Sequence, residues 1–204
     1  GRLAVATDKC KSSGAGQVMH IEQDFCLGVG GVLQAIEGKR IDLIIDAASA
    51  SSRYRDAEIA PHDIPRYVSA DFLSRVEIME HISSNQDTAP AMIFVSTVLT
   101  MVKSPGRTIY TALKMLHETY LTKLRDSRPD FRLLLVHVAT VIDTRNETSK
   151  PRTLASAVVN AFNSGKEKLF FGRSGILLLV LFYAQPVLFN GVTIAQRKIR
   201  QFLA

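Results

Sequence analysis

A tyrosine and a lysine four residues apart, Tyr110 and Lys114, are the residues of this 204-residue chain whose spacing most clearly suggests chemistry. The residues around them have a helical pattern, and in a helix positions i and i+4 lie on one face, one turn apart. A phenol has an ordinary pKa of ~10 and is a poor acid at neutral pH. A nearby cation favours the phenolate and lowers that pKa. The pair is therefore predicted to act as a general acid–base on an alcohol or carbonyl oxygen.

Two hydroxyl side chains, Ser96 and Thr97, follow an apolar run that predicts a strand over Ala91–Val95. A hydroxyl at the end of that strand can hydrogen-bond the same substrate oxygen and stabilise charge on it. Either residue satisfies this requirement, so both are candidates.

Short apolar runs alternate with helical patterns along the chain, which indicates an α/β sheet with crossover helices. The expected strands are Leu3–Thr7, Ile41–Ile45, Ala91–Val95, Phe131–Val138 and Lys168–Phe171. The expected helices are Val29–Glu37, Val68–Ile82, Pro105–Arg125 and Leu154–Asn163, with a loop or broken helix over 53–67. Apart from Asp42, the run Ile41–Ile45 is continuous rather than alternating, as expected of a strand buried on both faces. The second helix has a predicted buried stripe made of Phe72, Leu73, Val76, Ile78 and Met79.

The composition is that of one ordinary globular domain, with 47% hydrophobic and 22% charged residues. The two cysteines, Cys10 and Cys26, have neither disulfide-framework nor metal-ligand spacing, so we expect no metal and a reducing, cytoplasmic compartment. The formal charge of +6 comes from scattered basic residues, which favours a solubility role over nucleic-acid binding.

The order of strand, hydroxyl, YxxxK helix and strand resembles the short-chain dehydrogenase/reductase family, in which a serine lies about thirteen residues before the catalytic tyrosine. Thr97 lies 13 residues before Tyr110 and matches the spacing, whereas Ser96, 14 before, matches the residue type. The resemblance implies an NAD- or NADP-dependent oxidoreductase that interconverts an alcohol and a ketone, and a homo-oligomer such as a dimer. Tyr110 would be the acid–base, and Lys114 would lower its pKa and hold the cofactor ribose.

Further motifs of that family occur in the same order. The tract 46–49 resembles the NNAG motif that lies against the cofactor, with Asp and Ala in place of the two asparagines and Ser49 in place of the glycine. Residues 139–144 resemble the PGxVDT loop that covers the nicotinamide, and Asp71 lies near the family's structural asparagine. The cofactor-binding residues that the resemblance implies are Asp24, Ala47, Ala48, Ser49, Lys114, Ile142 and Thr144. Asp8 favours the free ribose of NAD and Lys9 the 2′-phosphate of NADP, so the choice of cofactor stays open.

The family begins with a strand and a TGxxxGxG turn, and nothing equivalent precedes Leu3–Thr7, which resembles the family's second strand. The glycines of 28–31 look like the start of a helix instead. We therefore expect a doubly wound, Rossmann-like parallel sheet without its first βα unit. Because the first strand is central in the order 3-2-1-4-5-6, three interpretations follow. The sequence is a fragment, which Gly1 favours; or the second strand has moved beside the fourth; or another chain supplies the strand.

The last residues form a distinct segment, so we expect a Rossmann-like domain over 1–172 and an apolar and basic helical tail over 173–204. A transmembrane helix needs ~20 apolar residues, and this apolar run is interrupted by Gln185 and Pro186. It is interpreted either as a buried helix or dimer contact, or as a peripheral membrane contact through 176–189. An apolar segment at this place resembles that of bacterial reductases acting on polyprenyl-linked sugars, which adds a lipid-linked alcohol or ketone to the candidate substrates.

The changed motifs also support a second hypothesis. The chain would then be a non-catalytic relative, a scaffold or interaction protein that keeps the fold and does not bind the dinucleotide.

Overall fold

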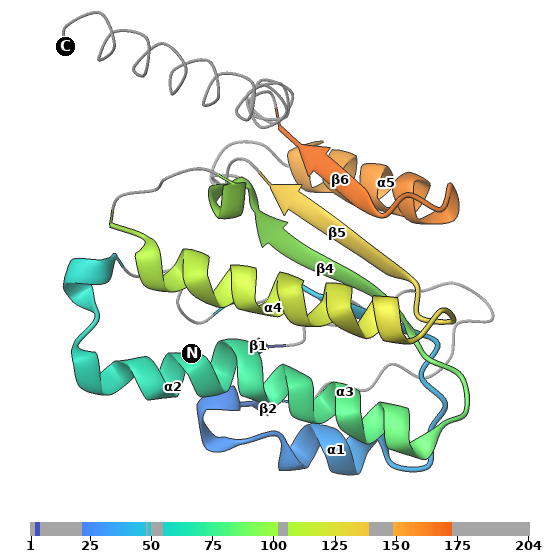
Figure 1. Cartoon of the computed structure of the whole chain (residues 1–204), viewed down its shortest axis with the longest axis horizontal. Coiled ribbons are helices and arrows are strands. Elements are labelled where there is room, and N and C mark those ends of the chain that lie inside the picture. The colour runs from blue at the N-terminus through green and yellow to red at the C-terminus, as the bar shows by residue number, and fades with distance from the viewer. Residues whose placement is uncertain are drawn as a thin grey trace, which may run out of the picture.

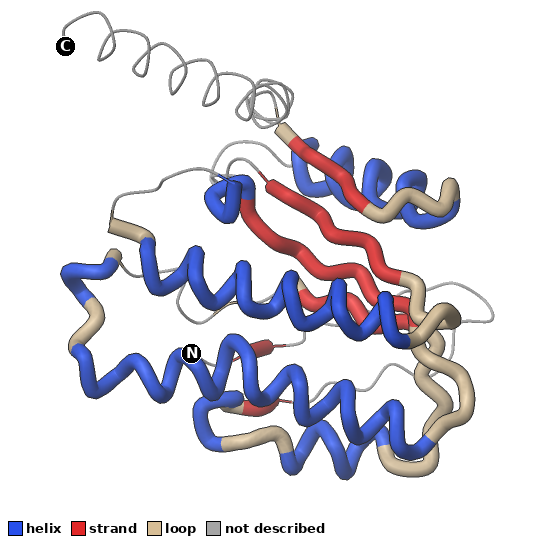
Figure 2. The backbone as a smooth tube through the Cα atoms, in the orientation of Figure 1, coloured by secondary structure: helices blue, strands red, loops and turns tan. Residues whose placement is uncertain are grey.

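The structure is a computed structural model that describes residues 3–4, 22–47, 49, 55–101, 106–138 and 149–172. At its centre lies a parallel sheet of four strands in the order β3-β4-β5-β6 (Figures 1 and 2). The strands are β3 (Leu43–Asp46), β4 (Ala91–Thr97), β5 (Leu133–Val138) and β6 (Lys168–Phe171). The predicted strands along this stretch are therefore confirmed, and the sheet is the α/β architecture expected from the sequence.

The helices also follow the predicted pattern. They are α1 (Gly30–Ile36), α2 (Ile64–Val68), α3 (Ser74–Asn85), α4 (Thr108–Ser127) and α5 (Ser149–Asn163). A π-helical turn, η5 (Ser69–Leu73), joins α2 to α3. The short 3-10 turns of the described residues are η1 (Phe25–Leu27), η3 (Asp56–Glu58), η4 (Pro61–Asp63) and η6 (Val98–Met101). The glycines of 28–31 do lead into a helix, α1.

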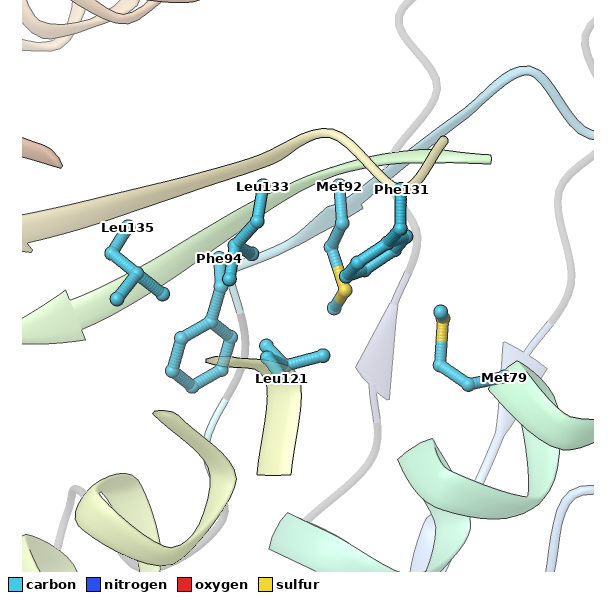
Figure 3. Packing of buried hydrophobic residues seen from close by; sticks show 7 residues of the cluster. All are labelled: Met79, Met92, Phe94, Leu121, Phe131, Leu133 and Leu135. Carbon is cyan, nitrogen blue, oxygen red and sulfur yellow. The ribbon is translucent and has the colours of Figure 1, made fainter. Parts of the chain in front are cut away.

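Two apolar clusters hold the three layers together. Between the sheet and the helices α3 and α4 lie Met79, Met92, Phe94, Leu121, Phe131, Leu133 and Leu135 (Figure 3). On the opposite face, Ile93, Leu134 and Val136 pack against Ala161 of α5. Successive residues of a strand point to opposite faces. Both faces of β4 and β5 are therefore apolar, which explains their nearly continuous apolar runs.

The connection through α5 has an unusual hand. Each of the connections β3–α3–β4, β4–α4–β5 and β5–α5–β6 steps to the next strand in the same direction along the sheet. The helices α3 and α4 lie on one face and α5 on the other (Figure 1). Connections that step the same way with helices on opposite faces have opposite hands. Since crossovers are almost always right-handed, the β5–α5–β6 connection is the left-handed exception.

The expectation that the strand at Ile41–Ile45 is buried on both faces is wrong. Leu43 and Ile45 of β3 are 42% and 63% exposed. Their register partners in β4 are Ala91 and Ile93, so they share the face that α5 covers farther along the sheet. The strand β3 is the last of the four-stranded sheet, and α5 packs on β5 and β6. A strand can therefore be continuously apolar without being covered on both faces.

Two further expectations need correction. Leu73 is 53% exposed and is not part of a buried stripe, because the π-helical turn that it ends changes the angular spacing of the residues around it. Leu3–Ala4, the described part of the expected first strand, forms β1 outside the parallel sheet and pairs antiparallel with β2 (Glu22–Gln23). Antiparallel pairing needs only a local return of the chain, whereas parallel pairing needs a crossover of a dozen or more residues.

Within the described residues, no helix is long and apolar enough to cross a bilayer. The expected tail, 173–204, lies outside the described residues, and its boundary with the domain stays a prediction.

Candidate active site

The first residues of α4 are held by a carboxylate from a distant part of the chain. Arg107, at the N-cap, has no side chain that can accept a hydrogen bond from the helix. Asp56 of η3 accepts bonds from the backbone amides of Thr108 (2.8 Å) and Ile109 (3.1 Å), and its own amide donates to Gly106 O (3.0 Å). These bonds lower the pKa of Asp56. They cap α4 immediately before Tyr110.

The structure separates the two hydroxyl candidates. Thr97 is the last residue of β4, and hydrogen bonding by its side chain lowers the pKa of Tyr110. Ser96 lies on the sheet face that α4 covers, and its hydroxyl donates a short hydrogen bond to Glu118 Oε1. Of these two residues, Thr97 is thus the one beside the tyrosine.

The half-buried Tyr110 side chain has a raised pKa. Burial is the largest cause, and the negative charges of Asp71 and Glu118 act in the same direction. The hydrogen bond from Thr97 and the charge of Arg107 act against the shift. The sequence led us to expect a lowered pKa, but the net shift is upward because burial outweighs the contributions that lower it.

Lys114 is buried one helical turn beyond Tyr110. Its ammonium donates to Val95 O at 2.9 Å and lies 4.6 Å from the centre of the Phe94 ring. Burial lowers the pKa of Lys114, while Asp46 acts in the opposite direction. Tyr110 and Lys114 thus lie one turn apart in α4, and Lys114 binds the backbone near the carboxyl end of β4.

An ion-pair cluster of Asp46, Asp71 and Arg75 lies near Lys114. Arg75 Nε is 2.6 Å from Asp46 Oδ2, at the end of β3, and Arg75 Nη1 is 3.9 Å from Asp71 Oδ1. The three side chains are 7%, 10% and 5% exposed, respectively. Arg75 also donates a short hydrogen bond to Ala70 O, and the Ser49 hydroxyl donates to Asp71 Oδ2 at 2.9 Å. The carboxylates of Asp46 and Asp71 thus lie in a network with a buried guanidinium.

A buried imidazole, His117, borders this cluster. Its Nδ1 lies 3.9 Å from Asp46 Oδ2, and its ring centre is 4.4 Å from that of Phe94. Neither ring nitrogen has a hydrogen-bond partner among the described residues. Burial is the main cause that lowers the pKa of His117 to about 4, so the ring is neutral at physiological pH.

A second buried imidazole lies on the other side of Glu118. His137 Nδ1 is 3.8 Å from Glu118 Oε1 and 3.5 Å from Thr97 O, and its ring stacks on Phe170 at 5.0 Å. Burial lowers the pKa of His137, against the opposing charge of Glu118. Glu118 thus connects Ser96 of β4 to His137 of β5 beneath α4.

Of the predicted cofactor residues besides Lys114, three belong to the described part of the chain and three do not. Asp24 lies 3.8 Å from Arg66, and Ala47 is exposed at the end of β3. Ser49 is bonded to Asp71 as described above. The remaining three, Ala48, Ile142 and Thr144, lie outside the described residues.

Sequence reasoning missed three residues of this site: Asp56, Arg75 and Glu118. A signal existed for two of them, because Glu118 is four residues after Lys114 and Arg75 is four after Asp71, which places each pair on one helical face. Asp56 is 52 residues from the amide that it binds, and no local pattern predicts that contact.

No protein-family model matches the sequence, and no curated protein matches it. Solved structures share its fold. A short-chain dehydrogenase from Streptomyces avermitilis has a TM-score of 0.70 at 13% identity, over 86% of this chain and 79% of its own. A short-chain dehydrogenase from Burkholderia cenocepacia J2315 in complex with NADP has a TM-score of 0.66 at 19% identity, over 84% and 78%. The bulky-bulky ketone specific alcohol dehydrogenase from Comamonas testosteroni has a TM-score of 0.66 at 16% identity, over 83% and 72%. The chain therefore has the Rossmann-like fold of the short-chain dehydrogenases.

Proposed function

We propose that the protein is a nicotinamide-dependent oxidoreductase that interconverts an alcohol and a ketone. The observation that carries the proposal is that Thr97, at the end of β4, acts on the pKa of Tyr110, with Lys114 one turn along α4. These residues lie at the carboxyl end of β4, and ligands of open α/β sheets bind outside the carboxyl ends of the strands. The fold shared with an alcohol dehydrogenase and with a dehydrogenase in complex with NADP supports the same class of reaction.

In this proposal, Tyr110 and Thr97 bind the reacting oxygen. A tyrosine whose pKa is raised keeps its proton at neutral pH, so Tyr110 is suited to protonate a carbonyl oxygen as the ketone is reduced. Thr97 donates a hydrogen bond to the same oxygen as negative charge develops on it. Ser96 does not have this role, because its hydroxyl donates to Glu118.

The described residues fit the nicotinamide end of a dinucleotide, which would supply or accept the hydride when bound. An ammonium has three N–H donors, so the bond from Lys114 to Val95 O is compatible with a second bond to a ribose hydroxyl. The exposed Ala47 at the end of β3 has only a methyl side chain, which lets a ligand approach the backbone. We propose the same contact role for Asp24, Ala48, Ser49, Ile142 and Thr144, and we propose no preference between NAD and NADP.

Titration of the complete protein with NADH and NADPH, followed by nicotinamide fluorescence, tests the proposal. We expect micromolar binding of one dinucleotide, and its oxidation in the presence of a ketone from a panel that includes bulky ones. Tyr110→Phe should bind the dinucleotide as the wild type does and lose turnover. Failure of the folded protein to bind either dinucleotide, or full turnover by Tyr110→Phe, would contradict the proposal.

The second candidate function is a scaffold that keeps the fold without dinucleotide binding. The bond between Lys114 and Val95 O favours it, because an ammonium held by the backbone differs from one that activates a tyrosine. The fluorescence titration separates the two functions, since a scaffold would bind neither dinucleotide.

Three finer proposals concern the substrate, the oligomeric state and the cellular location. A lipid-linked alcohol or ketone would require contact of 176–189 with a membrane surface, which sedimentation with anionic vesicles measures. A homo-oligomer would be seen by light scattering after size-exclusion chromatography. A cytoplasmic location, with or without that membrane contact, would be seen by cell fractionation.

A further inference from the structure

The cluster around Lys114 holds equal numbers of formal positive and negative charges. Asp46 comes from the end of β3, Asp71 from η5, Arg75 from α3 and Lys114 from α4. After burial, the charges of Asp46, Arg75 and Asp71 have the largest effects on the pKa of Lys114, followed by that of Glu118. The four charged side chains of the cluster thus act on one another in a site largely shielded from water, where electrostatic interactions are strong.

Arg75 has the geometry to neutralise both carboxylates at once. A guanidinium offers five N–H donors in a fixed planar fork. The side chain of Arg75 contacts Asp46 at 2.6 Å and Asp71 at 3.9 Å, and it also binds a backbone carbonyl of η5. The ring of Phe25 lies 5.8 Å from its Cζ. These contacts fix the guanidinium between the end of β3 and the turns η1 and η5.

We propose that Arg75 is a positioning residue that balances Asp46 and Asp71 beside Lys114 and thereby sets the pH range in which Lys114 and Tyr110 act together. The inference rests on the proposed function. Without the guanidinium, the cluster has one excess negative charge. That charge would raise the pKa of Lys114 and of His117, which both respond to Arg75. The negative charge of Asp71, no longer balanced, would raise the pKa of Tyr110.

Two residues report the charge balance without any turnover. His117 borders Asp46, and its pKa responds to both Asp46 and Arg75 with opposite signs. Its imidazole proton signals can be followed by NMR and assigned with His117→Gln. Tyr110 can be followed by ultraviolet absorbance of the tyrosinate, after subtraction of the same titration for Tyr110→Phe.

The test compares three variants. Arg75→Met leaves the cluster with one excess negative charge, whereas Asp46→Asn/Arg75→Met removes one charge of each sign and Arg75→Lys keeps the positive charge. For Arg75→Met we expect the midpoints of His117 and Tyr110 to rise, His117 by about one pH unit or more. In the double variant and in Arg75→Lys, both midpoints should return towards the wild-type values.

A purely structural role of Arg75 predicts a different result. The double variant, which lacks the whole ion pair, would then depart from the wild type at least as far as Arg75→Met, and this outcome would overturn the inference. If Arg75→Met does not fold, Asp46→Asn alone carries the test with the opposite sign, because it leaves one excess positive charge. Its His117 midpoint should then fall, because the charge of Asp46 raises the pKa of His117, and an unchanged midpoint would overturn the inference.

Turnover separates this inference from the proposed function. If the midpoints move as expected and the protein binds no dinucleotide, the charge balance stands and the oxidoreductase proposal fails. If the protein turns over a ketone and the pH profile of kcat in the variants does not follow the tyrosinate midpoints, the oxidoreductase stands and the role of Arg75 fails.

Discussion

Replacement of the buried His117 by leucine is expected to remove a large part of the pH dependence of stability. The imidazole is 1% exposed, and neither ring nitrogen has a hydrogen-bond partner in the described part of the chain. Its pKa falls from 6.5 to about 4 on folding, mainly because burial disfavours the charged ring. The unfolded chain therefore binds more protons than the folded one between these two values.

The sign and size of the effect follow from this difference. The contribution of His117 to stability is complete above pH 6.5 and is lost as the pH falls towards the folded value of about 4. A difference of about 2.5 pKa units corresponds to about 3 kcal/mol in the free energy of unfolding. At neutral pH the His117→Leu protein should be at least as stable as the wild type, because each unsatisfied buried polar group costs about 1–3 kcal/mol.

Urea denaturation from neutral to mildly acidic pH measures this effect. The wild type should lose about 2–3 kcal/mol more than His117→Leu between pH ~7 and ~4.5. The exposed His62, replaced by glutamine, is the matched control and should leave the pH dependence as in the wild type. If His117→Leu and the wild type lose stability in parallel as the pH falls, the assignment of a buried neutral imidazole is refuted.

Three further predictions concern bonds around the site and at the far end of the sheet. Thr97→Val should raise the pH midpoint of tyrosinate formation at Tyr110 further, because a hydrogen-bond donor to the phenolate is lost. Ser96→Ala should leave this midpoint nearly unchanged, since Ser96 donates to Glu118. The reverse order of effects would contradict the assignment of Thr97. Gln86→Ala should lower the free energy of unfolding in urea by about 1–3 kcal/mol. The reason is that the Gln86 side-chain amide binds both the backbone N–H and the backbone C=O of Ile41, just before β3. An unchanged free energy of unfolding would contradict this. Asp56→Asn should lower the unfolding temperature at neutral pH, because the carboxylate that caps α4 has a lowered pKa and stabilises the helix only when it is ionised. Calorimetry should show the difference in unfolding temperature between wild type and variant closing as the pH falls below about 4. A difference that does not depend on pH would contradict the cap.

The sequence by itself determined the elements and the two residues with the clearest chemistry. Apolar runs gave β3 to β6 at nearly the observed positions, and helical spacing placed Tyr110 and Lys114 on one face of α4. These features depend on the periodicity of strands and helices, which is local and therefore readable from neighbouring residues. The thirteen-residue spacing of the family that the sequence resembles favoured Thr97 and the residue type favoured Ser96, so the sequence left both hydroxyls open.

Only the tertiary structure decided what surrounds that pair. The hydroxyl that acts on Tyr110 is that of Thr97, because Ser96 lies under α4, where its hydroxyl donates a hydrogen bond to Glu118. The direction of the pKa shift of Tyr110 depends on burial, which the sequence does not give. The face of β3 that remains exposed depends on where α5 packs, which is equally a tertiary property.

The contacts of Asp56 and Arg75 show the physical reason. Asp56 caps α4 from 52 residues away, and Arg75 reaches Asp46 across 29 residues. Such contacts form because parallel strands and their crossover helices bring distant segments to the same end of the sheet. The spacing of Tyr110 and Lys114 is thus encoded within one helix, whereas the charged side chains around them come from the packing of four separate elements.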